Sequence, residues 1–255
     1  MRAIILAAGR GIRLQQTPAE ELPKCLLRFG DRSLLERHLR LLRACGVSEV
    51  VLALGFQYQL VEAELQRLDW HPRPRIVLNA EYELGSMLTV HTVADALTQG
   101  GDVLLMDADV LYHERIMQVL VAGAAPVNRV LIDQHFEPGD EPVKLCLRAG
   151  VPVELRKQVA AELRYDTIGE SVGFFRFSPA IAQRLAACVA DYVASGRSDL
   201  PHEEAVRDVL RESGACFDVA DVSNWPWIEI DFPQDITRAA GEVLPQLPPL
   251  PGLAV

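Results

Sequence analysis

The chain has 255 residues, of which 49% are hydrophobic, so it can bury the core of one large domain. Its formal charge of -10, from 35 acidic and 25 basic residues, argues against a general affinity for nucleic acid or an anionic membrane, which would need a basic face. Its apolar runs stay below the roughly 18 residues that span a bilayer. We therefore expect a cytoplasmic protein that binds small ligands, neither nucleic acid nor membrane, with a homo-oligomer left open.

The first 135 residues alternate short apolar runs with longer amphipathic ones, which is typical of parallel strands joined by crossover helices. The predicted strands are Ala3–Ala7, Val50–Ala53, Arg75–Leu78, Val103–Met106 and Arg129–Ile132. The predicted helices are a stretch from Ser33 to Gly46, with a capping box to Glu36, then Gln57–Leu68, Ser86–Leu97 and His113–Ala122. This pattern predicts an α/β fold, with a Rossmann-like, mixed and mainly parallel sheet flanked by helices.

A different pattern follows residue 135. Two β-rich runs on either side of Ala149-Gly150 predict a hairpin, and hence a small β-rich insertion. The runs and the later predicted elements are Val143–Arg148, Val151–Arg156, a strand at Val172–Phe177, helices at Ala180–Ala194 and Glu203–Ser213, a strand at Ile228–Ile230 and a helix from Pro233. A Pro-rich tail, residues 244–255, is expected to be a loose or packed-down extension.

A glycine-rich loop follows the first predicted strand, and Pro23-Lys24 comes shortly after it. Small residues let the backbone approach a phosphate and point N–H groups at it, while Arg13 and Lys24 supply positive charge. The third glycine of a dinucleotide fingerprint and the Walker pattern are both absent. The passage resembles the L-A-A-G-x-G-x-R and P-K signature of the nucleotidyltransferase superfamily that includes sugar-phosphate nucleotidyltransferases. The resemblance implies that Arg13 and Lys24 are catalytic, and that base and phosphates are bound by Leu6, Ala7, Ala8, Gly9, Arg10 and Gly11.

A second segment, from Asn79 to Met87, connects a predicted strand to a predicted helix at the carboxyl edge of the sheet, where open α/β folds bind ligands. It resembles the phosphocholine and related alcohol-phosphate cytidylyltransferases, which carry N-x-x-Y and then a small residue and Ser here. The resemblance implies that Asn79, Gly85 and Ser86 contact the nucleoside of CTP, although Gly85 stands where that branch often has Asn. From the residues alone, Ser86 can equally be an ordinary helix N-cap.

Two acids, Asp107 and Asp109, directly follow an apolar strand, where their mutual repulsion needs a cation such as Mg²⁺ to offset it. By resemblance to the D-A-D motif of the superfamily, Asp109 is the metal ligand and Asp107 belongs to the nucleotide site. The passage from Trp227 to Asp235 resembles W-x-D-I-D-T-P-E-D. This resemblance implies Asp231 as the other metal ligand, with Glu229 as the second choice.

Lys157 is the first predicted residue of the acceptor site. It resembles the second lysine of the superfamily, and this resemblance implies a catalytic residue that holds the acceptor phosphate. The other predicted acceptor residues are Glu170, Gly173 and Glu203. The aromatic content of 6% is too low to place a full cage for a quaternary ammonium, so we expect another phosphate or phosphonate, such as an amine-bearing one. None of the six histidines is assigned a catalytic role.

The resemblance as a whole implies Mg²⁺-dependent transfer of a nucleotidyl group, CMP from CTP, to a small phosphorylated or phosphonate acceptor, with release of pyrophosphate. We predict one domain over residues 1–243, with a nucleotide-binding half (1–135) and an acceptor-binding half (136–243). The alternatives are a sugar-1-phosphate nucleotidyltransferase using UTP, dTTP or GTP and a molybdopterin-type guanylyltransferase. A catalytically silent regulatory subunit is an alternative of another class, but such a subunit would not need Arg13, Lys24, Asp109 and Asp231 together.

Overall fold

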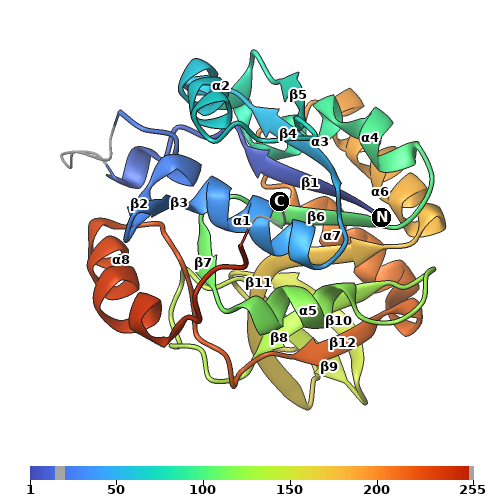
Figure 1. Ribbon diagram of the computed structural model, residues 1–255. Helices are drawn as coiled ribbons and strands as arrows, with labels where there is room; N and C mark the ends of the chain where they lie inside the picture. The colour runs from blue at the N-terminus through green and yellow to red at the C-terminus, as the bar shows by residue number, and fades with distance from the viewer. Residues whose placement is uncertain (15–20, 253–255) are drawn as a thin grey trace.

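A nine-stranded mixed sheet forms the centre of the computed structural model, which describes residues 1–14 and 21–252. The central part, in the order β6-β1-β4-β5, is parallel, and β11 adds to β6 in the antiparallel sense. The strands are β1 (Arg2–Ala7), β4 (Glu49–Leu54), β5 (Arg75–Leu78), β6 (Val103–Asp107), β8 (Arg129–Asp133), β9 (Lys144–Arg148), β10 (Val151–Arg156), β11 (Thr167–Phe177) and β12 (Asp218–Asp221). The predicted fold class, a mixed and mainly parallel sheet flanked by helices, is confirmed (Figure 1).

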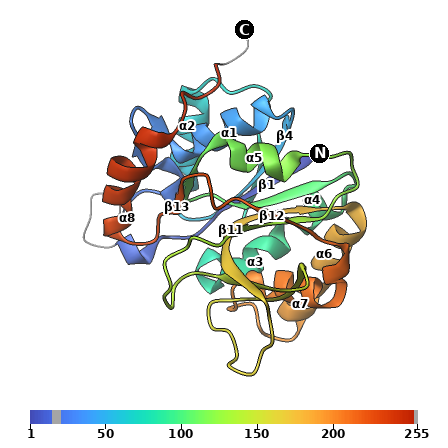
Figure 2. The same ribbon diagram turned by 90° about the horizontal axis from the view of Figure 1, so that it is seen from below.

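Helices cover both faces of this sheet, because alternate residues of each buried strand point to opposite sides. In β1, Ala3 and Ile5 pack into one apolar core and Ile4 packs into the other. The first core lies under α1 (Leu34–Ala44), α2 (Tyr58–Arg67) and α5 (Glu114–Val121). The second lies under α3 (Ser86–Thr92), α4 (Ala94–Thr98), α6 (Pro179–Ala194) and α7 (Glu203–Ser213). Figure 2 shows α1 and α5 on one side of β1 and β11, with α3, α6 and α7 on the other.

Several short elements were absent from the sequence predictions. They are the pair β2 (Arg28–Phe29) and β3 (Arg32–Ser33), the strand β7 (Val110–Tyr112), and β12, which pairs with β8 in parallel. Strands of two to four residues carry too little alternation to be recognised. The strand predicted at Ile228–Ile230 is β13 (Trp227–Glu229), shifted by one residue, and it pairs with β7. The predicted helix over residues 86–97 is wrong as one element, because it breaks at Val93, which leaves helical geometry with φ -103° and ψ 15°.

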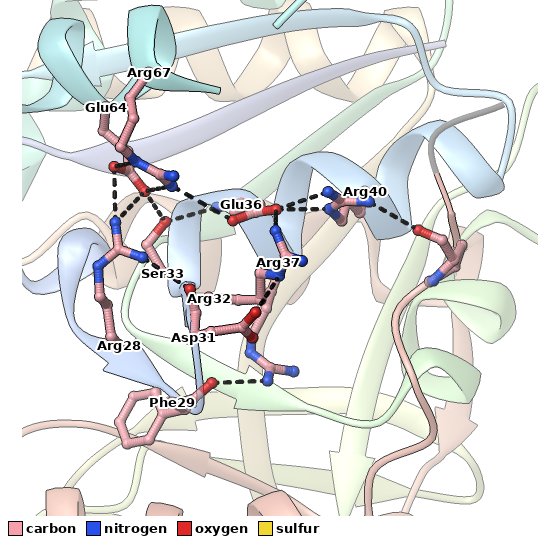
Figure 3. A network of polar contacts seen from close by, with 11 residues as sticks. Arg28, Phe29, Asp31, Arg32, Ser33, Glu36, Arg37, Arg40, Glu64 and Arg67 are labelled. Carbon is pink, nitrogen blue, oxygen red and sulfur yellow. Dashed lines mark hydrogen bonds and ion pairs between the residues drawn. The ribbon is translucent and has the colours of Figure 1, made fainter. Parts of the chain in front are cut away.

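The start of α1 belongs to a polar network that also holds the β2–β3 hairpin (Figure 3). Ser33 caps the helix as predicted, since its hydroxyl accepts the Glu36 N–H at 3.2 Å. The reciprocal half of the predicted capping box is wrong: the buried Glu36 carboxylate accepts hydrogen bonds from Arg32 and Arg40 instead. Buried Glu64 of α2 accepts hydrogen bonds from the Ser33 hydroxyl and from Arg28. The network therefore ties α2 to the β2–β3 hairpin, which follows the 3-10 turn Lys24–Leu26 along the chain.

The C-terminal segments run back over the molecule. They are α8 (Pro233–Arg238), a π-helical turn (Ala239–Val243) and a 3-10 turn (Leu244–Gln246). Of the predicted tail, Leu250 packs against the core under α1 and the Pro251 carbonyl accepts a hydrogen bond from Arg40 at 3.2 Å. Residues 253–255 of that tail, and residues 15–20 between the glycine-rich loop and Pro23-Lys24, lie outside the described residues. Within the described part of the chain, no helix is long and apolar enough to cross a membrane.

Candidate active site

A cleft of about 470 Å³ opens beside the carboxyl end of β1. We call it the glycine-loop cleft. It is lined by Leu6, Ala8, Gly9, Gly11, Ile12, Arg13, Lys24, Tyr82, Gly85, Ser86, Thr89, Asp107, Asp109, His202, Glu203, Glu229 and Asp231. Most of the predicted nucleotide-binding residues therefore meet in one place. Two residues of the predicted loop, Ala7 and Arg10, are not part of this lining, and the Arg10 guanidinium lies 5.8 Å from the Phe56 ring centroid.

Gly11 must be glycine because of both its backbone and its neighbour. Its φ of +64° lies in the left-handed region, and a Cβ there would stand 3.1 Å from Cγ of Lys24. The lysine side chain thus runs directly along the glycine loop. The backbone of Lys24 is fixed by a short 3-10 turn, Lys24–Leu26, in which its carbonyl accepts the Leu27 N–H at 3.0 Å.

Three carboxylates converge at one end of the cleft. Asp109 lies between β6 and β7, while Glu229 ends β13 and Asp231 precedes α8. The antiparallel pairing of β13 with β7 brings them together, because it places Glu229 opposite Val110 and lets the Ile230 N–H donate to the Asp109 carbonyl at 3.0 Å. One oxygen from each carboxylate lies within 4.8 Å of the others. An all-oxygen, anionic set of this kind fits a hard divalent cation.

Two basic residues pair with the two aspartates of this group. Lys24 Nζ lies 2.8 Å from Asp109 Oδ2 and 2.7 Å from Asp231 Oδ1. Arg13 Nη1 lies 2.7 Å from the other oxygen of Asp231. Burial alone would lower the pKa of Lys24, but the two aspartates outweigh it and raise that pKa above its usual value. Burial and the charges of Asp109 and Asp231 raise the pKa of Glu229 well above its usual value.

Asp107 stands slightly apart from this group. Burial, together with the charges of Glu203 and Asp109, raises the pKa of Asp107 to about 7, against the opposing effects of His202 and Lys24. A Cβ at Gly173 would stand 2.3 Å from Asp107 Oδ2, so the glycine on β11 is what allows this carboxylate its position. Gly173, predicted to bind the acceptor, lines neither this cleft nor the neighbouring cavity, and the structure places it close to the Asp107 carboxylate.

His202 and Glu203, at the start of α7, line the end of the cleft formed by Gly85 and Ser86. The Ser86 hydroxyl accepts the His202 N–H at 2.9 Å, and Ser86 is the first residue of α3, whose N-cap position is held by Gly85. His202 Nδ1 lies 3.1 Å from Glu203 Oε2. Burial lowers the pKa of His202, but Glu203 and Asp107 more than reverse this effect and raise it to about 9.

The loop before α3 is held by Asn79 and Gly85. Asn79 is 2% exposed, donates to the Thr89 hydroxyl at 3.0 Å and accepts the Glu81 N–H at 3.0 Å. Its amide is thereby occupied by the protein, and Asn79 does not line the cleft. Gly85 has a φ of +126°, and a Cβ there would stand 3.1 Å from the Asp199 carbonyl oxygen. Both residues therefore shape the cleft, whereas a direct contact of Asn79 with a nucleoside stays a prediction.

A second cavity, of about 420 Å³, adjoins the glycine-loop cleft and shares Glu229 and Asp231 with it. We call it the acidic hollow. Besides those two residues it is lined by Asp133, His135, Phe136, Glu137, Pro138, Gly139, Asp140, Glu141, Pro142, Glu170, Trp227, Ile228, Phe232, Asp235 and Arg238. Burial and the charges of Asp133 and Glu137 raise the pKa of Glu170 to about 7, while Lys144 and Arg238 act against this. The hollow therefore combines carboxylates with aromatic rings.

Lys157 lies near the acidic hollow without forming part of its lining. Its Nζ pairs with Glu141 Oε2 at 2.8 Å, and the same oxygen lies 3.4 Å from Arg13 Nη1. Glu141 thus connects the predicted acceptor lysine to a predicted catalytic arginine. Lys144 Nζ instead donates to backbone carbonyls, among them that of Lys157 at 2.6 Å. That Lys157 holds an acceptor phosphate stays a prediction.

Sequence reasoning missed His202, Glu141 and the loop of residues 133–142 that forms one wall of the acidic hollow. That loop has no periodicity, and its acids look like ordinary solvated charges. The available signal was its composition, since five of its ten residues are acidic or aromatic next to a predicted strand end: Asp133, Phe136, Glu137, Asp140 and Glu141.

Comparison with known proteins identifies the family of this chain. Residues 3–171 match the MobA-like NTP transferase domain, and the chain belongs to that family. It is 29% identical over 258 residues to a CMP-5'-(3-aminopropyl)phosphonate synthase of Streptomyces rubellomurinus, covering 94% of this chain and 38% of that protein. It is 28% identical to a bifunctional IPC transferase and DIPP synthase of Rubrobacter xylanophilus, covering 95% of this chain and 52% of the relative. The chain thus spans about half the length of these relatives, or less.

Solved structures show the same fold. The inositol-1-phosphate CTP transferase from T. maritima superposes with a TM-score of 0.74 at 20% identity, covering 96% of this chain and 95% of that one. A CTP:phosphocholine cytidylyltransferase from Streptococcus pneumoniae superposes with a TM-score of 0.72 at 18% identity, covering 94% and 97%. The architecture is therefore that of nucleotidyltransferases.

Proposed function

We propose that this protein transfers CMP from CTP to a small, amine-bearing phosphate or phosphonate, with Mg²⁺ as cofactor and pyrophosphate as the second product. The observation that carries the proposal is the acidic hollow, which shares Glu229 and Asp231 with the glycine-loop cleft. An acceptor in that hollow would present its phosphate to the shared carboxylate edge and its amine to the acids and rings behind. Carboxylates and aromatic faces both attract a cationic amine.

The proposed reaction is an in-line displacement. An oxygen of the acceptor phosphate or phosphonate attacks the α-phosphorus of CTP, the bond to the β-phosphate bridging oxygen breaks, and pyrophosphate leaves with that electron pair. The attacking oxygen is already ionised, so catalysis is positioning and charge neutralisation by Arg13, Lys24 and the backbone of the glycine loop. Mg²⁺ held by Asp109 and Asp231, with Glu229 beside them, would supply further positive charge for the phosphates.

Cytosine is favoured over other bases on two grounds. Relatives and structural neighbours whose names state a nucleotide include a CMP-5'-(3-aminopropyl)phosphonate synthase, an inositol-1-phosphate CTP transferase and a CTP:phosphocholine cytidylyltransferase. Asn79, Tyr82 and Ser86 also resemble the pattern of the cytidylyltransferase branch, from which Gly85 departs. The alternative is a sugar-1-phosphate nucleotidyltransferase, favoured by relatives named mannose-1-phosphate guanyltransferase that match parts of the chain. A silent regulatory subunit is disfavoured, because it would not need the three carboxylates that can hold a metal ion together with Lys24 and Arg13.

The proposal is tested by measuring pyrophosphate release over a matrix of nucleotides and acceptors. CTP, UTP, dTTP, GTP and ATP are each paired with phosphoethanolamine, aminoethylphosphonate, phosphocholine, glycerol phosphate, inositol phosphate and hexose-1-phosphates. We expect CTP with an amine-bearing acceptor to give the highest kcat/KM. Propylphosphonate, which matches aminoethylphosphonate in size but lacks the amine, should be about 10- to 100-fold poorer, as for loss of one charge-assisted contact. Highest turnover of a hexose-1-phosphate with UTP, dTTP or GTP would select the alternative.

Glu170 makes the use of the amine pH-dependent. Its pKa of about 7 means that the carboxyl is neutral below this pH and attracts an ammonium group above it. The KM for aminoethylphosphonate should therefore fall between pH 6 and pH 8. In Glu170→Gln the KM for aminoethylphosphonate should be higher than in the wild type, and the part of its pH dependence that comes from Glu170 should be absent. Propylphosphonate provides the control, because it shares the ionisation of the phosphonate but has no amine. An equal fall of KM for both acceptors in the wild type would show that Glu170 does not bind the amine.

A further inference from the structure

Lys24 occupies the position between the two aspartates that the proposed metal would need. Its Nζ contacts Asp109 Oδ2 at 2.8 Å and Asp231 Oδ1 at 2.7 Å. The second oxygen of Asp231 is already bound to Arg13 at 2.7 Å. A divalent cation binding both aspartates therefore competes with Lys24 for the same lone pairs, and the two positive charges would repel each other in a partly buried site.

The Lys24 side chain can also reach a second position, beside the glycine loop. Its stem runs along Gly11, with Cγ and Cε 3.1 and 3.2 Å from where a Cβ of Gly11 would stand. Rotation about the bonds of its flexible four-carbon chain can therefore bring the ammonium group to the glycine loop, whose N–H groups would bind the triphosphate. The backbone of the lysine need not move for this exchange, since it is fixed by the 3-10 turn and by the hairpin that Arg28 ties to Glu64.

Burial decides when the exchange can happen. The Lys24 side chain is 14% exposed, so its charge is costly without an anionic partner. Metal alone would remove its partners and offer none in return, whereas a triphosphate offers a new anion next to Gly11. We infer that Lys24 is a built-in counter-ion of the metal site, which is displaced to the phosphates only when the metal and the nucleotide enter together. This inference rests on the proposed metal site and goes beyond it by setting the order of binding.

The test measures Mn²⁺ binding, by electron paramagnetic resonance and calorimetry, to protein without nucleotide. We expect Lys24→Met to bind Mn²⁺ at least about tenfold more tightly than the wild type, because the competing cation is gone. Lys24→Arg keeps a competing cation and should stay close to the wild type. Lys144→Met, the matched control, removes the same charge from a lysine that bonds backbone carbonyls, and it should also stay close to the wild type.

Two further measurements, of Mn²⁺ binding with a nucleotide analogue and of thermal stability, test the same inference. A non-hydrolysable CTP analogue should tighten Mn²⁺ binding strongly in the wild type and much less in Lys24→Met, since the variant has no lysine that can move from the aspartates to the phosphates. In EDTA, Lys24→Met should melt at a lower temperature than the wild type, and Mn²⁺ should raise its melting temperature more. If this variant does not fold, Lys24→Gln takes its place.

Equal Mn²⁺ affinity of Lys24→Met and the wild type, or an equal gain in Lys144→Met, would overturn the inference. Neither result would touch the proposed function, which stands or falls on wild-type turnover in the nucleotide and acceptor matrix. Conversely, absence of turnover with every pair would remove the proposed function while leaving the Mn²⁺ measurement interpretable.

Discussion

Asp109→Asn and Asp231→Asn should each lower kcat by a factor on the order of 10³, because each removes a negative ligand from the site proposed for Mg²⁺. The change preserves the size and shape of the side chain, and an amide oxygen can still accept a hydrogen bond from Lys24. The variants should therefore remain folded. The measurement is turnover against Mg²⁺ concentration, with thermal melts in EDTA recorded in parallel.

Asp95→Asn is the matched control, since it removes the same charge from an exposed position on α4. It should retain wild-type turnover at every Mg²⁺ concentration. Near-wild-type activity of Asp109→Asn or Asp231→Asn at ordinary Mg²⁺ would remove that residue from the metal site. Glu229 would then be the next ligand to test, because one of its oxygens lies within 4.8 Å of the same group.

The largest effect on stability is expected at a buried ion pair remote from the carboxylates. Arg176 of β11 is fully buried, and its guanidinium contacts Asp102 Oδ2 at 2.7 Å. The arginine also donates to the carbonyls of Val121 and Ala122, both at 2.8 Å. Asp102→Ala leaves this charge buried without its partner, so it should cost about 3–5 kcal/mol of unfolding free energy. The melting temperature should fall by roughly 6–20 °C.

Urea denaturation measures this loss, and an exposed pair provides the control. Arg184 and Glu212 are about half exposed, so Glu212→Ala should cost less than about 1 kcal/mol. Arg176→Met in the Asp102→Ala background should recover part of the loss, because it removes the uncompensated charge. A cost below about 1 kcal/mol for Asp102→Ala would show that water reaches Arg176 and replaces the carboxylate.

Local sequence patterns were sufficient for most of the scaffold. The apolar runs of β1, β4 and β6 identified the centre of the sheet, because strands buried on both faces need uninterrupted hydrophobic residues. Gly11 was predicted as part of the glycine-rich loop, and its φ of +64° agrees with the backbone freedom that this loop requires. Short elements such as β2, β3 and β7 escaped recognition because two or three residues carry no measurable period.

The sequence by itself determined the buried strands and the glycine loop, because these follow from local periodicity and local backbone demands. The residues expected to bind metal and phosphate were inferred mainly from the resemblance to the nucleotidyltransferase superfamily. Tertiary structure alone decided that β13 pairs with β7 and so brings Asp231 to Asp109 and Lys24. It also decided that the Asn79 amide forms hydrogen bonds with Thr89 and Glu81. The tertiary structure likewise places the loop of residues 133–142 in the wall of the acidic hollow beside the site. The physical reason is the same in each case. Which distant segments pair, and which of several competing partners a polar group bonds, depends on the packing of the whole chain, and no local pattern records it.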